Sequence, residues 1–321
     1  MEAKMKKQKH LNHLNDFLFY KVMGEKGDEV QLLGFLNAVL GKTGEDCFTA
    51  VEIIENKQLS PKVIGDKSIV LDVRAVLQGK TRVNIEVQIR NKYNMARRSL
   101  FYWSREYTES LGEGQDYKEL PDVIAVNIVN FNFPPVRNSH TRFHLREDID
   151  HDLVLTDALE IHFLNMVQYR KERKKIPLDN PLNRWLVWFD SGSPPELIEE
   201  VAKMDDAIQA AIERLDFATR DKEFLRFYHM RQMAMSDRTT EINTAIEEGL
   251  EKGLKKGLKK GRAEGRAEGR AEGRVEGRVE GLAQGRQEGI LEIARKMKAA
   301  GRPSAEIAEF TDLPAEAIEQ L

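Results

Sequence analysis

The stretch SIVLDVRAVLQGKTRVNIEVQI, residues 68–89, decides the fold class of this chain. It contains two runs rich in β-branched residues, 68–77 and 82–89, and the turn signal Gln78-Gly79-Lys80 lies between them. Two such runs joined by a short glycine-containing turn are typical of an antiparallel hairpin. We therefore expect two neighbouring strands of a sheet here, paired around Gly79.

The segments on either side of this hairpin alternate between helical and strand patterns. Apolar residues recur at spacings of three and four over 11–41 and again over 94–113, which predicts helices in both ranges. Further strands are expected at 48–54, 123–131, 141–146 and 156–163. The order helix, three strands, helix, strand predicts an α/β fold with a mixed sheet flanked by helices.

The remainder of the chain reads as helical, and its composition changes along the way. Amphipathic helices are expected from about 166 to 245, and glycine then recurs at every fourth position from Gly249 to Gly289. The last residues resemble a small helix-turn-helix. The expected division is a core at 11–165, a helical extension at 166–245, a repeat-bearing charged arm at 246–290 and a small C-terminal helical segment at 291–321.

Composition narrows the class of protein only a little. The 50 Lys and Arg nearly balance the 53 Asp and Glu, so the net charge of -3 neither demands nor excludes a nucleic-acid partner. The single cysteine, Cys47, excludes an internal disulfide framework and a cysteine-based zinc site, and it favours a reducing cytoplasm. No apolar run is long enough for a signal peptide or a membrane span, so a cytoplasmic protein without a membrane partner is expected.

Polar residues interrupt the two apolar strands of the hairpin. Asp72 lies within IVLDVRAV, and Glu86 and Gln88 lie two apart within VNIEVQI, so these two share one face. A carboxylate among apolar strand residues is costly unless it is paired or bound to a cation, and pairing around Gly79 brings Asp72 within reach of Glu86. Two carboxylates with the Val87 carbonyl suit Mg²⁺. The alternative from the residues alone is that both lie on an exposed edge and bind nothing.

Several phrases in this order resemble the Rpn family of recombination-promoting nucleases and transposases, a branch of the PD-(D/E)XK nuclease superfamily. They are NDFLFYKVMG (15–24), LLGFLNAVLG (32–41), GDKSIVLDVRAVLQGKTRVNIEVQ (65–88) and RRSLFYWSREYTESLGEGQDYKELPDVIAVNIVNF (97–131), and the close resemblance spans 15–163. It implies a restriction-endonuclease-like fold and a Mg²⁺-dependent endonuclease that hydrolyses double-stranded DNA with low sequence specificity, in recombination or element mobility. The alternative is a catalytically weak or inactive nuclease-like scaffold that binds DNA or protein.

The resemblance gives the hairpin residues particular roles. Asp72 and Glu86 become catalytic metal ligands with the carbonyl of Val87, and Mn²⁺ or Ca²⁺ could substitute for Mg²⁺. Gln88 occupies the place of the superfamily's lysine. It can orient a water molecule or touch a phosphate, but it brings no positive charge, and this departure favours the scaffold alternative.

Residues outside the hairpin complete the expected site. Asp16 matches the acidic residue of the first helix that can reach the metal, although Asn15 or Asp16 could equally be a helix cap. Lys67, Arg97 and Arg98 are expected to contact DNA phosphates, and a merely solvated surface is the alternative. Arg74 and Arg105 are further candidates.

The arm raises a separate question of stability and purpose. In a helix with a four-residue repeat, Arg faces Arg and Glu faces Glu at i,i+4, and each of the eleven glycines costs up to about 1 kcal/mol relative to alanine. A marginally helical arm is therefore expected. Two uses stay open: a Gly/Ala stripe that joins chains into a homo-oligomer, or an arm whose Lys and Arg follow DNA.

Overall fold

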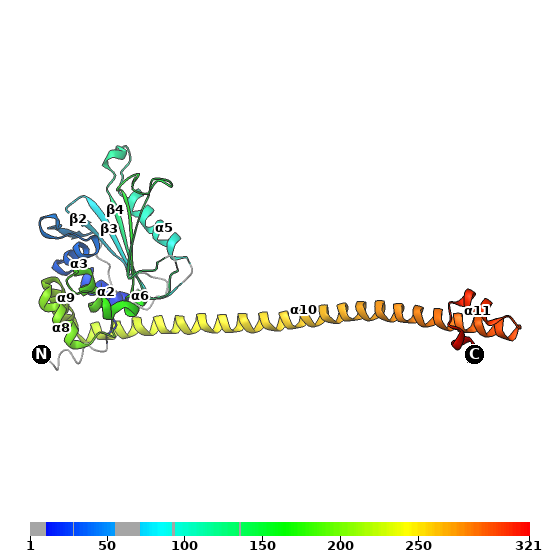
Figure 1. Cartoon of the computed structure of the whole chain (residues 1–321). Coiled ribbons are helices and arrows are strands. Elements are labelled where there is room, and N and C mark those ends of the chain that lie inside the picture. The colour runs from blue at the N-terminus through cyan, green and yellow to red at the C-terminus, as the bar shows by residue number, and fades with distance from the viewer. Residues whose placement is uncertain (1–10, 28, 55–70, 92–93, 135) are drawn as a thin grey trace. The chain divides into compact units, whose positions relative to one another are not determined.

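The computed structural model describes residues 11–27, 29–54, 71–91, 94–134 and 136–321. Its contacts divide the chain into a unit that ends at Thr239 and a second unit, Thr240–Leu321. The first unit contains a sheet with helices on both faces (Figure 1). Within the described residues, no helix is long and apolar enough to cross a membrane.

The described residues form a six-stranded mixed sheet, as predicted, with the order β1-β2-β3-β4-β6-β5. Strands β1 to β3 are antiparallel, β3, β4 and β6 are parallel, and β5 is antiparallel to β6. The strands are β1 Val51–Ile53, β2 Val73–Leu77, β3 Thr81–Gln88, β4 Val123–Val129, β5 His140–His144 and β6 Leu159–Asn165.

The hairpin between β2 and β3 is confirmed. Val73 pairs with Ile85 and Leu77 with Thr81, so the turn contains the predicted glycine. Gly79 has a φ of 68°, in the left-handed region that favours glycine, and this allows the tight reversal. The first residues of the expected strand, 68–70, lie outside the described residues.

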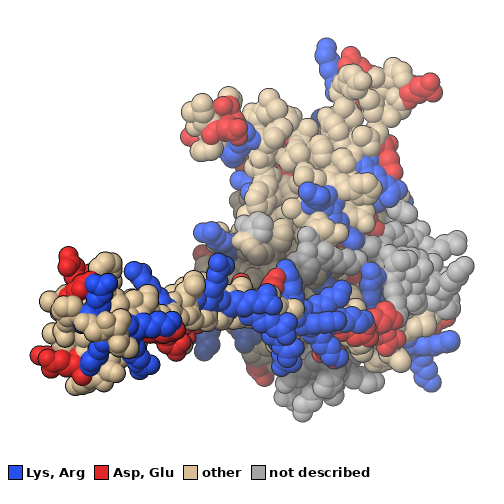
Figure 2. Space-filling view, turned by 90° about the vertical axis from the view of Figure 1, so that its right-hand side faces the viewer, with Lys and Arg blue, Asp and Glu red and all other residues tan. Residues whose placement is uncertain are grey.

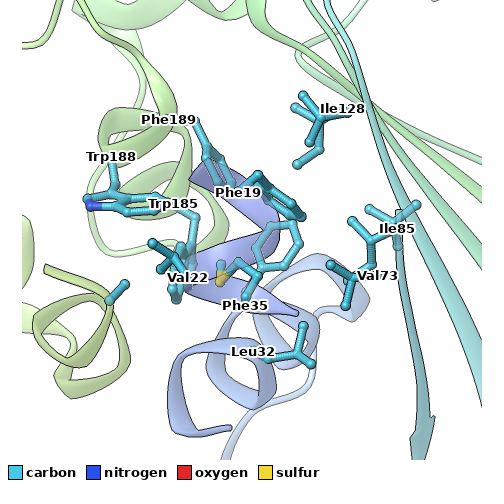
Figure 3. Close-up of a cluster of buried hydrophobic side chains, with 14 of the residues drawn as sticks. Phe19, Val22, Leu32, Phe35, Val73, Ile85, Ile128, Trp185, Trp188 and Phe189 are labelled. Carbon is cyan, nitrogen blue, oxygen red and sulfur yellow. The ribbon is translucent and has the colours of Figure 1, made fainter. Parts of the chain in front are cut away.

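One face of the sheet packs on α2 (Asp16–Met23), α3 (Val30–Leu40) and α7 (Pro181–Phe189). The predicted helical range 11–41 is thus two helices. Aromatic rings fill the layer between them and the sheet, with Phe35 lying 5.4 Å from Trp185 and 5.3 Å from Phe189 between ring centres (Figure 3). This large, rigid core fixes the hairpin that bears the polar residues.

The opposite face of the sheet is covered by α5 (Met95–Thr108). Side chains of β4 alternate between the layers: Ile128 belongs to the core under α2 and α3, whereas Ala125 and Val129 pack with Met95 of α5. Trp103 Nε1 donates to the Val123 carbonyl at 2.9 Å and ties α5 to the sheet. Polar residues of β2 and β3 on this face therefore lie under α5.

The helices from residue 166 to the first turns of α10 pack onto the same core as the sheet. Ala207 of α9 contacts α3 at Gly34, and Phe224 and Tyr228 of α10 are buried in the core. The described helices of this part of the chain are α6 Met166–Glu172, α8 Pro195–Met204, α9 Asp206–Ala218 and α10 Lys222–Ala299. Short 3₁₀ turns lie at Gly44–Asp46, Tyr117–Glu119 and Arg173–Lys175.

The repeat-bearing arm differs from the sequence-based expectation, because α10 continues unbroken through all of it to Ala299. The packed first turns of α10 supply the nucleus, and adding residues to an existing helix needs no second nucleation. Lys252 also pairs with Glu248 at 3.1 Å, and Lys255 with Glu251 at 2.7 Å, both at i,i+4.

The C-terminal end of the second unit has a small apolar cluster of its own. Ala294 at the end of α10 packs with Ile307 of α11 (Ser304–Thr311) and Ile318 of α12 (Ala315–Glu319). Gly301, with a φ of 76°, makes the turn between α10 and α11.

Replacing Gly34 with alanine tests the close approach of α3 and α9. A Cβ at residue 34 would overlap the Cβ of Ala207. We expect Gly34→Ala to lower the free energy of unfolding by about 1–3 kcal/mol, despite the better helix propensity of alanine. Chemical denaturation measures this. The double variant Gly34→Ala with Ala207→Gly should recover most of the loss, and a single variant as stable as the wild type would show that the two helices do not touch there.

Candidate functional site

The polar residues of the hairpin lie on the α5 face of the sheet. Val73 and Ile85 are register partners and point into the core beneath α2 and α3. Because side chains alternate along a strand, Asp72 before Val73 and Glu86 after Ile85 both turn to the other face. Extending the register by one residue sets them opposite each other, where Cβ atoms of paired strands lie about 4.5–5.5 Å apart.

Glu86 is only 1% exposed, and its charge is compensated by Arg98 of α5. Arg98 Nε donates to Glu86 Oε1 at 2.8 Å, and Arg98 Nη2 donates to the same oxygen. Burial by itself would lower the pKa of Arg98, but the hydrogen bond and attraction to Glu86 raise it above its usual value. The guanidinium therefore stays charged beside the carboxylate.

Tyr102 and Asp72 belong to the same group of charges. Arg98 Nη2 donates to Tyr102 Oη at 3.3 Å, and the guanidinium carbon lies 5.1 Å from the centre of the ring. Burial raises the pKa of Tyr102, Arg98 opposes the rise, and the charges of Glu86 and Asp72 add to it. We call Asp72, Glu86, Arg98 and Tyr102 the Glu86 cluster.

Gln88 and Val87 end the strand that carries Glu86. Gln88 Nε2 donates to the Arg90 carbonyl at 3.0 Å, which holds the amide close to the backbone. The Val87 side chain is buried in the core. Its carbonyl is therefore the group through which Val87 could bind a metal.

Asp16 lies at the start of α2, but Asn15 is the residue that caps the helix, through hydrogen bonds to its side chain from Phe17 N and Leu18 N. The buried Asp16 carboxylate forms a two-pronged pair with Arg231 of α10: Nε donates to Oδ1 at 2.9 Å and Nη2 to Oδ2 at 2.5 Å. This pair ties the first helix to α10.

The arginines expected to contact phosphate have different surroundings. Arg97 is exposed on α5. Arg74 Nη2 instead donates to Glu106 at 3.0 Å and to Glu109 at 2.9 Å, and Arg105 Nε donates to Glu109 at 2.6 Å. In Figure 2, Lys and Arg side chains gather in a band across the middle of the view, and Asp and Glu lie mainly around that band. Lys67 lies outside the described residues.

The two carboxylates of the Glu86 cluster, Asp72 and Glu86, are donors of a kind that divalent metal ions accept. Among the described residues, no group of three or more His, Cys, Asp or Glu side chains could hold a metal. Magnesium is commonly bound by one or two carboxylates together with waters and substrate phosphates, so it does not require such a group. Asp72 and Glu86 are the two carboxylates that such a site would use.

A second group of titratable residues, which the sequence analysis did not connect, lies on β5 and β6. His140 Nε2 and His162 Nδ1 are 2.9 Å apart, and His162 Nε2 is 2.9 Å from Glu160 Oε1. Burial, aided by the nearby His162 and Arg142, lowers the pKa of His140 to about 4. The i,i+2 spacing of Glu160 and His162 on a strand was the one available signal.

Local sequence patterns did not predict the partners of the Glu86 and Asp16 carboxylates. Arg98 and Tyr102 are four apart on a helix, which suggests that their side chains meet but does not place them on Glu86. Arg231 is 215 residues from Asp16, and no local pattern connects the two.

Glu86 on β3 and Asp72 just before β2 thus lie on the face of the mixed sheet that α5 covers with Arg98. Residues 13–245 match the family described as PD-(D/E)XK nuclease family transposase, and the chain belongs to this family. The family implies nuclease activity linked to mobile elements, a divalent metal and a DNA substrate, and the Rpn resemblance is consistent with it. No curated protein and no solved structure matches the chain at a significant level.

Replacing Asp16 with asparagine separates a structural from a catalytic role. Loss of the carboxylate removes the charge of Asp16 from beside Arg231, which is 4% exposed. We expect Asp16→Asn to lower the free energy of unfolding by about 3–5 kcal/mol in metal-free buffer. Chemical denaturation measures the change. If the variant unfolds like the wild type yet cannot cleave DNA, Asp16 acts in the reaction instead.

Proposed function

We propose that this protein is a Mg²⁺-dependent endonuclease with a restriction-endonuclease-like fold, which hydrolyses phosphodiester bonds of double-stranded DNA with little sequence preference. What supports the proposal most is that Glu86 of β3 and Asp72, the residue just before β2, would face each other if the register of the hairpin continued by one residue, in a chain of a nuclease family. Recombination or the movement of genetic elements is the setting that fits this family.

Asp72, Glu86 and the Val87 carbonyl would hold the ion, and Mn²⁺ or Ca²⁺ could take its place because all three prefer oxygen ligands. When bound, the metal lowers the pKa of a water molecule and neutralises charge on the phosphate. Glu86 is suited to this because its carboxylate is buried. Charge interactions are stronger in the protein interior than in water.

The neighbouring residues would position the substrate. The Gln88 amide has a donor and an acceptor with which to orient the attacking water, but no charge to stabilise the phosphate. Arg97, Arg98 and Lys67 would contact the DNA backbone. Phosphate contacts carry no sequence information by themselves, which supports low specificity. Asp16, paired with Arg231, would act by tying α2, which packs on the other face of the sheet, to α10.

A catalytically weak scaffold is the second candidate, and two observations favour it. The place of the superfamily's lysine is taken by Gln88, and Arg98 already compensates the charge of Glu86. Incubating the purified protein with supercoiled plasmid, with Mg²⁺ and then with a chelator, decides between the two. A folded protein that binds DNA but leaves the plasmid intact with Mg²⁺ and with Mn²⁺ would establish the scaffold.

Removing either carboxylate should abolish nicking. We expect Asp72→Asn and Glu86→Gln each to slow Mg²⁺-dependent plasmid nicking by at least about 100-fold, since each removes charge that holds the cation. Glu109→Gln is the matched control, because Glu109 is a carboxylate of the adjoining helix turn outside the Glu86 cluster. Normal nicking by either site variant, with an unchanged melting curve, would refute the assignment.

The arm is proposed to join two copies of this chain. The eleven glycines form a stripe that drifts about 40° per repeat around α10, and two helices that follow such a stripe must cross with a right-handed twist. An arginine follows each glycine from Gly261 to Gly277 on one side of the stripe, and a glutamate precedes each glycine from Gly265 to Gly281 on the other side.

This order of charges favours a parallel pair. When two arms face each other through their glycines and run in the same direction, the arginine side of one lies beside the glutamate side of its partner, at both edges of the contact. An antiparallel pair would place arginine beside arginine and glutamate beside glutamate. Like charges at such edges are destabilising. Leu250, Leu254 and Leu258 add an exposed apolar strip next to the first glycines.

Deleting residues 249–289 should leave nicking intact but halve the mass of the particle. The Glu86 cluster lies outside the deleted segment, whereas the stripe is removed with it. Sedimentation velocity measures the mass.

An arm that follows DNA would give a different result. The tract holds 11 Lys and Arg against 7 Glu, so its loss would then flatten the salt dependence of DNA binding by about 0.9 in log–log slope for each lost phosphate contact, at constant mass.

A further inference from the structure

We propose that Arg98 is a built-in counter-ion of the metal site, so that its guanidinium and a divalent cation compete for the Glu86 carboxylate. This inference rests on the proposed metal site at Asp72 and Glu86. It assigns Arg98 a role in metal loading that is distinct from its expected contact with phosphate.

The contact is close and specific. Two nitrogens of Arg98, Nε at 2.8 Å and Nη2, donate to the single oxygen Oε1 of Glu86. Glu86 is almost wholly buried, and Arg98 is itself largely covered. A carboxylate in such surroundings needs a positive partner, and the Arg98 guanidinium is one.

A metal ion would need the same carboxylate. Magnesium binds carboxylate oxygens at about 2.0–2.1 Å, and an oxygen that accepts two guanidinium hydrogen bonds has little remaining access for a small, strictly octahedral cation. The positive charge of Arg98 also repels the cation. The two cannot both be in full contact with Oε1, and a cation on the second oxygen, Oε2, would still be repelled by the nearby charge of Arg98.

Tyr102 gives the displaced guanidinium a place to go. Its hydroxyl already accepts from Arg98 Nη2 at 3.3 Å, and its ring lies 5.1 Å from the guanidinium carbon. The Arg98 side chain can thus rotate away from Glu86 while it keeps its contact with the Tyr102 ring. Once turned, it presents its fork of donors to a phosphate, a geometry that suits phosphate oxygens.

The alternative is that Arg98 only fixes α5 to β3. A fixing role and a competing role predict opposite changes in metal affinity. Loss of a fixing residue loosens the site and weakens metal binding, whereas loss of a competitor strengthens it.

Titration of Mn²⁺ into the full-length, DNA-free protein, followed by the electron paramagnetic resonance of free Mn²⁺, tests the inference. We expect Arg98→Gln to bind Mn²⁺ at least about tenfold more tightly than the wild type, the equivalent of about 1.4 kcal/mol. Arg97→Gln is the matched control, since it removes the same charge from the next, exposed position of α5 and should leave the affinity within about twofold. Arg98→Lys, which keeps the charge but not the fork, should lie between the wild type and Arg98→Gln.

The outcomes separate this inference from the proposed function. If Glu86→Gln binds Mn²⁺ as tightly as the wild type, the metal site itself is wrong. If Glu86→Gln weakens binding while Arg98→Gln and Arg98→Lys both bind no better than the wild type, the site stands and the competition is refuted. Should Arg98→Gln fail to fold in a thermal melt, the comparison of Arg98→Lys with the wild type decides alone.

Discussion

The charge of one buried carboxylate organises this site. Glu86 lies on β3, an inner strand of the described sheet, and such a charge persists only beside a cation. Arg98 supplies positive charge beside it in the structure, and the proposed metal ion would supply more. The buried carboxylate requires positive charge beside it. Helix α5 lies over the polar side of the hairpin and brings Arg98 to Glu86, and Tyr102 contacts the Arg98 guanidinium.

The rest of the first unit makes the carboxylate's position rigid. The aromatic layer under α2, α3 and α7 packs on the inward side chains of β2 and β3, so the outward side chains are fixed by the same strands (Figure 3). Helices beyond residue 166 complete this layer, and the first turns of α10 contribute Arg231 to Asp16. The family match ends at residue 245, close to the end of this unit at Thr239.

Local patterns predicted much of the fold and part of the site. The turn at Gly79, the period-two side chains and the continuous apolar β4 come from neighbours in sequence, so their patterns were visible. Contacts between segments that are distant in the sequence could not be predicted from local patterns. No sequence pattern near Asp16 predicts its pairing with Arg231. The residues around Arg98 do not show whether it binds phosphate or pairs with Glu86. The arm was expected to be marginally helical because local propensity cannot include the packed turns from which α10 extends.

The placement of a cation between Asp72 and Glu86 is the central claim, and anomalous diffraction from crystals grown with Mn²⁺ tests it most directly. We predict one strong peak within bonding distance, about 2.0–2.2 Å, of oxygens from both carboxylates, with the Arg98 guanidinium turned away from Glu86 Oε1. A Mn²⁺ peak elsewhere in the protein, with Arg98 still donating to Glu86, would contradict the account.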